Sequence, residues 1–482
     1  MEPVLHKIDT ELPLSYMEKL LDFIQKKYLF PQKQRFANIT RTKSETGNYL
    51  SYMVLNAEGK QSLLVEVKAS APVELKLQPI FEQVPETDVE EAEQDVVIAL
   101  QIFEETVRKT TLYFAWREGE EIVPEIASKG EKSLQRIFLE TQVTLFILFT
   151  GIALFLFAIV SVYYPDLTWI TPLILIGTQF IFVFFSTKFI ARTADWHITM
   201  DNPTIHILKY ILPIKEGGDL NKTYTREQLL QIKKEIYEEI LAKHGEISCE
   251  SARKVFEKYG IACHSENLSS RKVNVYELVK KTADKFGYPT PEIVVSNTML
   301  PNAAASGPSP SRGLVLITTG LLVQLEEEEI HSVLGHEFGH LKGRDPLLLY
   351  GLTSGEFLFR FYVLFPFFQF MLNPFLFFIY FWVVMILIFF VAKFFEARSD
   401  LISAIEIGQP EILAGALEKI GFQRLLYERT PSFRVQEWIG FDPHPPIYFR
   451  INRLERLKTP VNIKHPLIQS IKDVMSGFFA TI

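Results

Sequence analysis

Residues 336–340 read His-Glu-Phe-Gly-His, two histidines four positions apart with a glutamate beside the first. An α-helix turns by roughly 100° per residue, so His336 and His340 would lie one turn apart on the same face. Two imidazoles in this arrangement can bind one Zn²⁺, and Glu337 would lie close enough to polarise a water molecule at the metal. The stretch therefore predicts a metal site on a helix.

The surrounding residues favour a helix over a chance match. Apolar side chains recur with helical spacing, and the acidic run 326–329 precedes them, where negative charge favours the start of a helix. These apolar positions are Ile330, Val333, Leu334, Phe338 and Leu341. With 10 His among 482 residues, composition alone would produce such a motif on the order of 0.01 times.

A zinc hydrolase needs a third protein ligand and one open position for water. A histidine six residues after His340, as in metzincins, is excluded because position 346 is Pro. Glu396 and Asp400 would share one helix face, so Glu396 could bind the metal while Asp400 accepts a hydrogen bond from a ligand imidazole. Alternatively, Glu396 and Arg398 are ordinary charges that follow an apolar segment.

The chain carries several apolar runs long enough to cross a bilayer. Residues 143–163 and 169–189 form two of them, and 375–395 forms a third, with Lys393 placed to extend towards the membrane surface. A fourth span is expected over 346–372, although it contains Glu356 and Arg360. These two could pair inside the bundle, but we favour a later start of the span, with the pair at the interface.

Basic residues indicate the orientation of these spans. They flank the runs but are missing from the turns 164–168 and 373–374, which places both turns outside and the large segments in the cytoplasm. The residues are Lys129, Lys132, Arg136, Lys188, Arg192, Lys342, Arg344, Lys393 and Arg398. We therefore expect a multi-pass protein of the cell membrane with four spans and a cytoplasmic N-terminus and zinc site. No apolar h-region follows Met1, so no cleaved signal peptide is expected.

Composition narrows the function classes. The mean hydropathy of +0.12 and the 40 Phe agree with a membrane protein. A net charge of −7 argues against a nucleic-acid partner. Cys249 and Cys263 are expected to be unpaired thiols in a reducing compartment, and two cysteines alone cannot make a zinc site.

The expected organisation has six parts. Residues 1–130 form an N-terminal cytoplasmic α+β domain, with strands at 49–55, 62–67 and 111–116 and a helix at 89–109. A transmembrane hairpin (138–190) and a helical insert (191–271) follow; in the insert, a capping box from Thr225 to Gln228 opens a helix that runs to about His244. The domain expected to carry the metal site covers 272–345 and 396–482, interrupted by a second hairpin at 346–395. Its first part has a helix at 273–286, strands at 292–296 and 313–318, and a loop at 301–312.

Four motifs in this order carry a resemblance. They are His336-Glu-Phe-Gly-His340, Glu396-x-x-x-Asp400 after a pair of spans, Asn302-Ala-Ala-Ala-Ser-Gly307, and His444-Pro-Pro-Ile-Tyr-Phe-Arg450. Together they resemble the integral-membrane zinc metalloproteases of the HtpX and type I CAAX prenyl protease family. The resemblance covers about 272–458 and the first span pair, and it leaves out the N-terminal domain. Ser399 departs from the alanine that the family usually has before the aspartate.

The resemblance implies a fold and a set of roles. The fold would be an α+β membrane protein with a mainly helical, zincin-like metalloprotease domain. One Zn²⁺ per chain would be bound by His336, His340 and Glu396, with Asp400 behind a ligand and Glu337 as general base and acid. Asn302 and Ala303 would bind the substrate backbone, and His444 or Arg450 would polarise the scissile carbonyl or stabilise the oxyanion.

The predicted function is zinc-dependent endopeptidase action on membrane or membrane-proximal proteins at the cytoplasmic side, in protein quality control. The lipid bilayer and peptide substrates would be its partners. A processing protease for prenylated C-termini is one alternative, and a non-catalytic zinc-binding membrane scaffold is another. The N-terminal domain could regulate the enzyme or capture substrate, or serve only stability or assembly.

Overall fold

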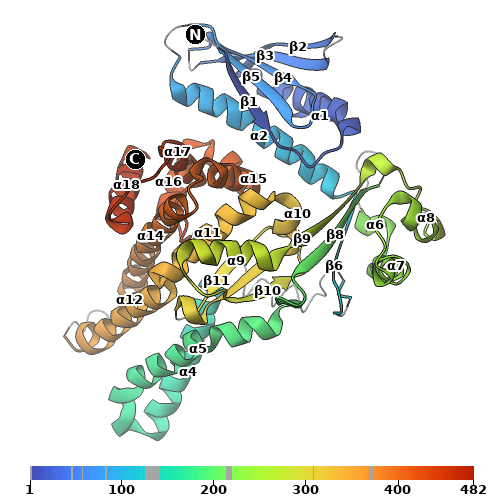
Figure 1. Cartoon of the computed structure of the whole chain (residues 1–482). Helices are drawn as coiled ribbons and strands as arrows, with labels where there is room; N and C mark the ends of the chain where they lie inside the picture. Colours follow the sequence, from blue (N-terminus) through green and yellow to red (C-terminus); the bar gives the residue numbers. More distant parts are fainter. Residues whose placement is uncertain are drawn as a thin grey trace. The chain divides into compact units, whose positions relative to one another are not determined.

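The computed structural model describes residues 3–44, 47–56, 58–81, 84–120, 122–124, 142–212, 220–307, 309–367 and 373–481 (Figure 1). The chain divides into two compact units. The first contains Met1–Trp116, His206–Lys272 and Glu418–Leu426, and the second contains Arg117–Ile205, Val273–Leu417 and Tyr427–Ile482. Lys129, Lys132 and Arg136, which entered the orientation argument, lie outside the described residues.

The first unit contains an antiparallel five-stranded sheet in the order β1-β5-β4-β3-β2. Its strands are β1 (Val4–Ile8), β2 (Phe36–Ser44), β3 (Gly47–Leu55), β4 (Gln61–Lys68) and β5 (Val73–Pro79). Leu63, Val65 and Val67 alternate along β4 and are fully buried, as expected where one sheet face covers a core. Helices α1 (Met17–Phe23) and α2 (Glu86–Arg108) complete this α+β part. It contains the strands expected at 49–55 and 62–67 and the helix expected at 89–109, while the strand expected at 111–116 belongs to a second sheet.

A second sheet, formed mostly by residues of the first unit, corrects the expectation of a helical insert. Strands β6 (Thr111–Arg117), β8 (Thr204–Ile211) and β9 (Leu268–Asn274) lie in the order β6-β8-β9. The insert also supplies helices α6 (Leu220–Thr223), α7 (Arg226–Glu239) and α8 (Cys249–Lys258). Ile205 and Ile207 are buried and two residues apart, a strand period that the helical interpretation overlooked. The capping box of Thr225 and Gln228 is confirmed at the start of α7.

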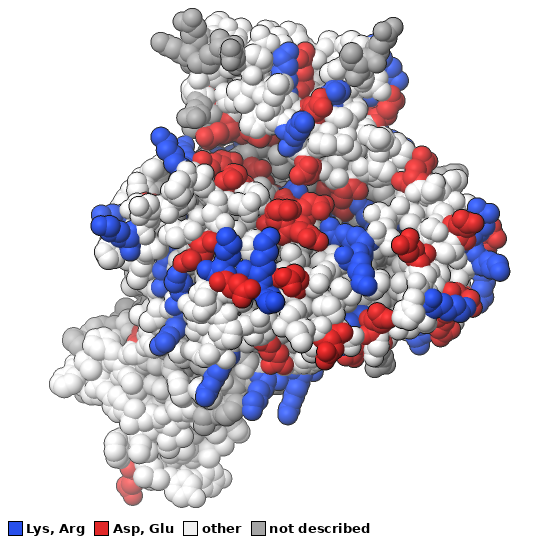
Figure 2. Space-filling model, viewed as in Figure 1, with Lys and Arg blue, Asp and Glu red and all other residues white. Residues whose placement is uncertain are grey.

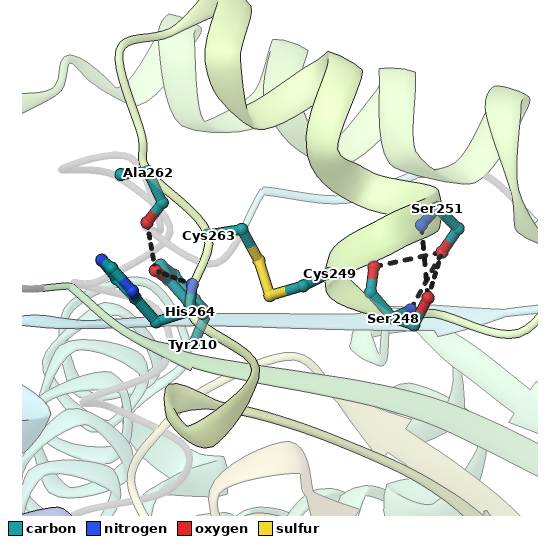
Figure 3. Close-up of a disulfide and its surroundings, with 7 residues drawn as sticks. All are labelled: Tyr210, Ser248, Cys249, Ser251, Ala262, Cys263 and His264. Carbon is teal, nitrogen blue, oxygen red and sulfur yellow. Dashed lines mark hydrogen bonds between the residues drawn. A yellow bond between two sulfur atoms is a disulfide. The ribbon is translucent and has the colours of Figure 1, made fainter.

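The two cysteines are bonded, which contradicts the expectation of unpaired thiols. Cys249 opens α8, and Cys263 lies in the segment that runs back towards β9 (Figure 3). Their Cα atoms lie 5.6 Å apart, within the range of disulfides. The hydroxyl of Tyr210 donates to the Ala262 carbonyl and accepts from the His264 amide, so the residues on both sides of Cys263 are held on β8. Spacing in the sequence alone does not reveal this chain reversal.

The second unit is built on a four-stranded sheet in the order β11-β12-β10-β7. Its strands are β7 (Trp196–Ile198), β10 (Glu292–Ser296), β11 (Ala303–Ser306) and β12 (Leu314–Thr318). β10 and β12 are parallel, while β11 runs antiparallel to β12 at one edge. Residues 301–312 were expected to be a loop, yet they contain β11, a four-residue strand of small side chains with little β propensity. Helices α9 (Val275–Phe286), α10 (Thr319–Gln324) and α11 (Glu327–Gly343) belong to the same unit.

The apolar runs form helices. The first two coincide with α4 (Gln142–Tyr163) and α5 (Thr171–Thr193), and the others with α12 (Asp345–Phe359), α13 (Phe365–Phe367) and α14 (Pro374–Glu406). Among the described residues, Asp345–Phe367 and Pro374–Glu406 are long and apolar enough to cross a membrane. The Tyr350 hydroxyl of α12 donates to the Ile176 carbonyl of α5 at 2.5 Å. The surface over α4, α5 and α12, at the lower left of Figure 2, shows almost no charged side chains.

Three charged residues of these helices make contacts inside the protein. Glu356 and Arg360 pair at 3.1 Å, and the Tyr380 hydroxyl of α14 donates to Glu356 at 2.9 Å, so the pair joins α12 to α14. Lys393, expected to extend towards a membrane surface, is fully buried, and its ammonium donates to the Asp442 carbonyl.

Four helices follow α14: α15 (Pro410–Glu428), α16 (Pro431–Ile439), α17 (Ile447–Glu455) and α18 (Pro466–Thr481). Trp438 of α16 and Val474 of α18 pack with Ala397 of α14 in one buried cluster. The last turns of α14 are therefore enclosed, and they carry the residues described next.

Candidate metal centre

Helices α11 and α14 approach each other closely because small residues face one another. A Cβ atom added at Gly339 would lie 3.0 Å from the Ser399 Cα, and one at Gly335 would lie 2.7 Å from the Ser403 Oγ. The Ser403 hydroxyl donates to the Ser332 carbonyl at 2.8 Å. This contact brings the motif helix against the turn of α14 that contains Glu396.

Three side chains converge at this contact. His336 Nε2 lies 3.1 Å from His340 Nε2 and 3.4 Å from Glu396 Oε2, and His340 Nε2 lies 3.3 Å from Glu396 Oε1. Two of the three residues come from α11 and the third from α14. The structure thus brings together the three residues that the sequence analysis named as ligands.

The donor set fits zinc. Two ligand atoms on one tetrahedral Zn²⁺, each about 2.0–2.2 Å from it, lie about 3.3–3.5 Å apart. The observed separations of 3.1, 3.3 and 3.4 Å are close to that geometry, and nitrogen and carboxylate oxygen are ligands that zinc accepts. Three protein ligands would leave a fourth position for water.

Each imidazole is oriented by a carboxylate behind it. His336 Nδ1 lies 2.8 Å from Asp400 Oδ1, the contact that the sequence analysis expected. His340 Nδ1 lies 2.8 Å from Asp345 Oδ2, which the sequence analysis missed. The signal was present as an aspartate five positions after His340. It comes into place because Arg344 adopts a left-handed conformation with φ 53° and turns the chain sharply between α11 and α12.

Buried arginines hold both carboxylates. Arg450 binds Asp400 through two hydrogen bonds, from Nε at 2.9 Å and from a terminal nitrogen at 2.7 Å. Arg398 donates to Asp345. Because Asp400 is fully buried and Arg450 nearly so, removing either partner would leave an uncompensated charge in the interior.

The carboxylates also set the protonation of the site. Burial by itself lowers the pKa of His336, but the hydrogen bond and charge of Asp400 outweigh it and raise that pKa to about 10. Burial likewise opposes protonation of His340, yet the charge of Glu396 raises the pKa of His340. A proton and a metal ion compete for the same nitrogen atoms, so metal binding would weaken as the pH falls.

Glu337 lies between the metal ligands and the edge strand. Its Oε2 accepts a hydrogen bond from the Ala305 amide of β11 at 3.0 Å. Asn302, just before β11, is fixed by its backbone, since its amide donates to Thr318 Oγ1 at 2.8 Å and its carbonyl accepts from the Thr318 amide at 3.0 Å. Ala303 opens β11 opposite Ile317. The edge strand is thus positioned beside the motif helix.

His444 and Arg450, named together as carbonyl or oxyanion groups, occupy different places. His444 Nε2 lies 3.5 Å from Glu396 Oε2, with 42% of its side chain exposed. Arg450 is buried behind Asp400 and is engaged there by two hydrogen bonds. The geometry therefore favours His444 for contact with a substrate and Arg450 for holding Asp400.

Comparisons with known proteins cover the part of the chain that carries this site. The model of peptidase family M48 matches residues 269–458. The protease HtpX homolog 2 of Methanosarcina acetivorans is 30% identical over 218 residues, which cover 38% of this chain and 72% of that protein. The protease HtpX homolog of Thermodesulfovibrio yellowstonii is 40% identical over 74 residues, 15% of this chain and 26% of the relative. That of Thermococcus sibiricus is 42% identical over 74 residues, 25% of its length.

The chain thus spans about a quarter of the length of the first curated relatives it matches, 26% and 25%. Among solved structures, the crystal structure of S. mikatae Ste24p matches with a TM-score of 0.31 and 15% identity, over 37% of this chain and 48% of that chain. The family model spans β11, the motif helix, Glu396 and His444, and 72% of the M. acetivorans protein aligns. The chain therefore belongs to peptidase family M48, with HtpX-like relatives.

Proposed function

We propose that this protein is a zinc-dependent endopeptidase. The observation that carries the proposal is the convergence of His336, His340 and Glu396, whose ligand atoms all lie within 4.8 Å of one another, next to Glu337. A structural metal site would need no carboxylate at position 337, whereas peptide hydrolysis needs a general base there.

The residues divide the chemistry between them. When bound, Zn²⁺ supplies Lewis-acid activation of water and of the scissile carbonyl. The Glu337 carboxylate accepts a proton from the attacking water and then returns it to the leaving amine. In its doubly protonated form, His444 donates from Nε2 to the oxyanion that develops on the carbonyl oxygen, while Nδ1 stays on Asp442. Asp345 and Asp400 keep the ligand imidazoles in orientation, and Arg450 holds Asp400.

The edge strand β11 is the proposed binding place for substrate. An extended peptide can add to an open sheet edge through backbone hydrogen bonds. The Ala305 amide, which donates to Glu337, faces away from β12 towards the motif helix. A peptide bound along Asn302 and Ala303 would therefore pass beside Glu337.

A membrane setting is proposed from the apolar helices. The helices α4, α5, α12 and α14 would form four spans of a cell-membrane protein, with the N-terminus and the zinc site in the cytoplasm. Glu396 follows the apolar run 375–395 directly, which supports a site close to the membrane surface. Substrates would then be membrane proteins or membrane-proximal segments, and the role would be protein quality control.

Two alternatives remain as outcomes of the test. A processing protease for prenylated C-termini would cleave prenylated peptides in preference to unmodified ones. A non-catalytic zinc scaffold would bind the metal and cleave nothing. The intact Glu337 and its position next to β11 favour catalysis over a scaffold.

The test compares wild type with Glu396→Gln, both purified in detergent. Wild type should hold about one zinc per chain. It should cleave unfolded membrane proteins, lose this activity when a chelator is added and regain it with Zn²⁺. Glu396→Gln should lose both metal and cleavage. Full activity of Glu396→Gln would rule out this ligand set, and preference for prenylated peptides would favour the processing alternative.

A further inference from the structure

We propose that Lys393 is a positioning residue that holds the His444 loop against α14. This inference rests on the proposed endopeptidase function, because it concerns the placement of His444. Lys393 stands three residues before Glu396 and was expected to serve the membrane surface. Its side chain is instead fully buried, and its ammonium donates to the backbone carbonyl of Asp442.

The segment that carries His444 has no regular structure of its own. Residues 440–446 lie between α16 and α17 and form neither helix nor strand. Its three prolines restrict the backbone locally, but its position relative to α14 depends on contacts with neighbouring elements. The Asp442 carbonyl, two residues before His444, is the point at which Lys393 does so.

The Asp442 side chain in turn orients the His444 imidazole. Its Oδ1 accepts from the His444 amide at 2.8 Å and lies 2.8 Å from His444 Nδ1. With Nδ1 bound to a carboxylate, the opposite nitrogen Nε2 is turned towards Glu396 Oε2, 3.5 Å away. The backbone of Asp442 is thus held by Lys393 while its side chain orients His444.

The residues of α14 that contact the 440–446 segment and the metal site lie on one face of the helix. Phe389, Lys393 and Glu396 follow one another at spacings of four and three residues, so they share a helix face. The Phe389 ring contacts the Phe441 ring, with centroids 6.0 Å apart, beside the contact of Lys393 with Asp442. The helix that provides a metal ligand therefore also fixes the loop that provides His444.

A buried ammonium is costly to desolvate, and Met at this position would have a similar length and no charge. Since outer partners of metal-site residues are typically worth about 10–100-fold in activity, we expect Lys393→Met to lower kcat by that factor. The KM should change by less than about threefold, because no substrate contact is removed. The zinc content should equal that of wild type, because His336, His340 and Glu396 remain.

The experiment uses the full chain in detergent and two readouts. Hydrogen exchange should quicken in residues 440–446 of Lys393→Met, and stay as in wild type for the exposed control Lys464→Met. As a single change, Lys393→Met should lower kcat by about 10–100-fold. Added to His444→Ala, it should leave kcat almost unchanged, because both changes remove the same contribution. Unchanged exchange in 440–446, or an equal loss in both backgrounds, would overturn the inference.

The exchange readout separates this inference from the proposed function. A wild type that cleaves nothing would contradict the endopeptidase proposal, while exchange would still report whether Lys393 holds the loop. If Lys393→Met does not fold, Lys393→Gln replaces it, since its amide can still donate to the Asp442 carbonyl. Exchange and kcat of Lys393→Gln should then lie close to wild type, and an exchange rate raised throughout the second unit would overturn the assignment.

Discussion

At the scale of residues, the site consists of two chains of contacts, in each of which an imidazole contacts a carboxylate and the carboxylate contacts a guanidinium. His340 contacts Asp345, which in turn contacts Arg398. In the same way, His336 contacts Asp400, which contacts Arg450. The two aspartates and the two arginines are buried, so the loss of one of them leaves an unpaired charge that costs about 3–5 kcal/mol. The imidazoles are thereby oriented before any metal binds.

A different histidine of the same helix makes stability depend on pH. His331 is buried in α11, with Nδ1 2.8 Å from the Thr282 hydroxyl of α9. Burial, followed by the charges of Lys281 and Lys285, lowers the pKa of His331 to about 4. The folded protein therefore keeps this ring neutral, while the unfolded chain protonates it near its ordinary pKa of 6.5.

The sign follows from proton binding. Between about pH 6.5 and pH 4 the unfolded chain binds a proton that the folded protein does not, so this contribution to stability is lost as the pH falls through that window. The measurement is denaturant unfolding of wild type and His331→Gln at a series of pH values. Wild type should lose more stability than His331→Gln on going from pH 7 to pH 4. Parallel curves would contradict the prediction.

At the scale of elements, the decisive contact is that between α11 and α14. Gly335 and Gly339 let the helices approach until the Glu396 carboxylate reaches both imidazoles. Spacing predicts the helix and the shared face of His336 and His340, whereas it leaves Glu396 open, and the resemblance to the family implies Glu396 as the third ligand. The close approach depends on small residues far apart in the chain, so the pattern of neither helix reveals it.

A larger residue at this contact should separate the ligands. In Gly339→Val the added atoms would meet Ser399, whose Cα lies 3.0 Å from the Cβ position. Because overpacking of a tight interface typically costs about 1–3 kcal/mol and shifts the backbone, we expect Gly339→Val to lower zinc content and Tm together.

The matched control is Ser399→Ala at the same contact. The Ser399 hydroxyl is buried, and the described residues offer it no hydrogen-bond partner. Its removal should keep zinc and raise stability by about 1 kcal/mol, the lower end of the cost of an unsatisfied buried hydroxyl. Normal zinc binding in Gly339→Val would show that the helices can separate without harm.

The disulfide belongs to the same scale. It closes a ring of about 15 residues between α8 and the start of β9, for which loop-closure entropy predicts about 3 kcal/mol. The double variant Cys249→Ser/Cys263→Ser should exchange its amides faster over 226–274 than oxidised wild type. Reductant should bring wild type to the same rate and leave the double variant unchanged. Equal exchange in all samples would mean that the bond stabilises nothing.

At the scale of the whole molecule, the basic residues and the disulfide indicate opposite orientations in the membrane. The distribution of Lys and Arg predicts that the large segments lie in the cytoplasm, where thiols are kept reduced, while a disulfide is typical of oxidising compartments. Lys393 and Arg398, both counted in the charge pattern, are buried in contacts with Asp442 and Asp345. Counting the Lys and Arg residues near the spans takes no account of such contacts, so the sequence predicts the orientation in the membrane less well than it predicts the metal site.

We expect orientation to follow the basic residues. Single cysteines at the exposed positions Asp166 and Lys464, introduced into the cysteine-free variant, would report it with a membrane-impermeant maleimide on intact cells. Asp166→Cys should react from outside, and Lys464→Cys only after lysis. The reverse pattern would place the zinc site outside and agree with the disulfide.

The architecture of the whole chain was only partly predictable. The α+β character of the N-terminal part and the interruption of the metal-binding domain by apolar helices follow from local periodicity. Strands β8 and β11 could not be predicted from local periodicity, because a short strand is stabilised by its partners in the sheet. β8 pairs within the sheet β6-β8-β9, and β11 pairs with β12. β11 bears directly on the proposed function, since its Ala305 amide contacts Glu337.

The most direct test of the central claim changes one carboxylate and leaves the metal in place. Zinc content and cleavage of a panel of membrane proteins would be measured for wild type and for Glu337→Gln in detergent. The account predicts equal zinc in both and cleavage by wild type only, because Glu337 moves the proton but binds no metal. Equal cleavage by the two proteins, or zinc in both and cleavage by neither, would contradict it.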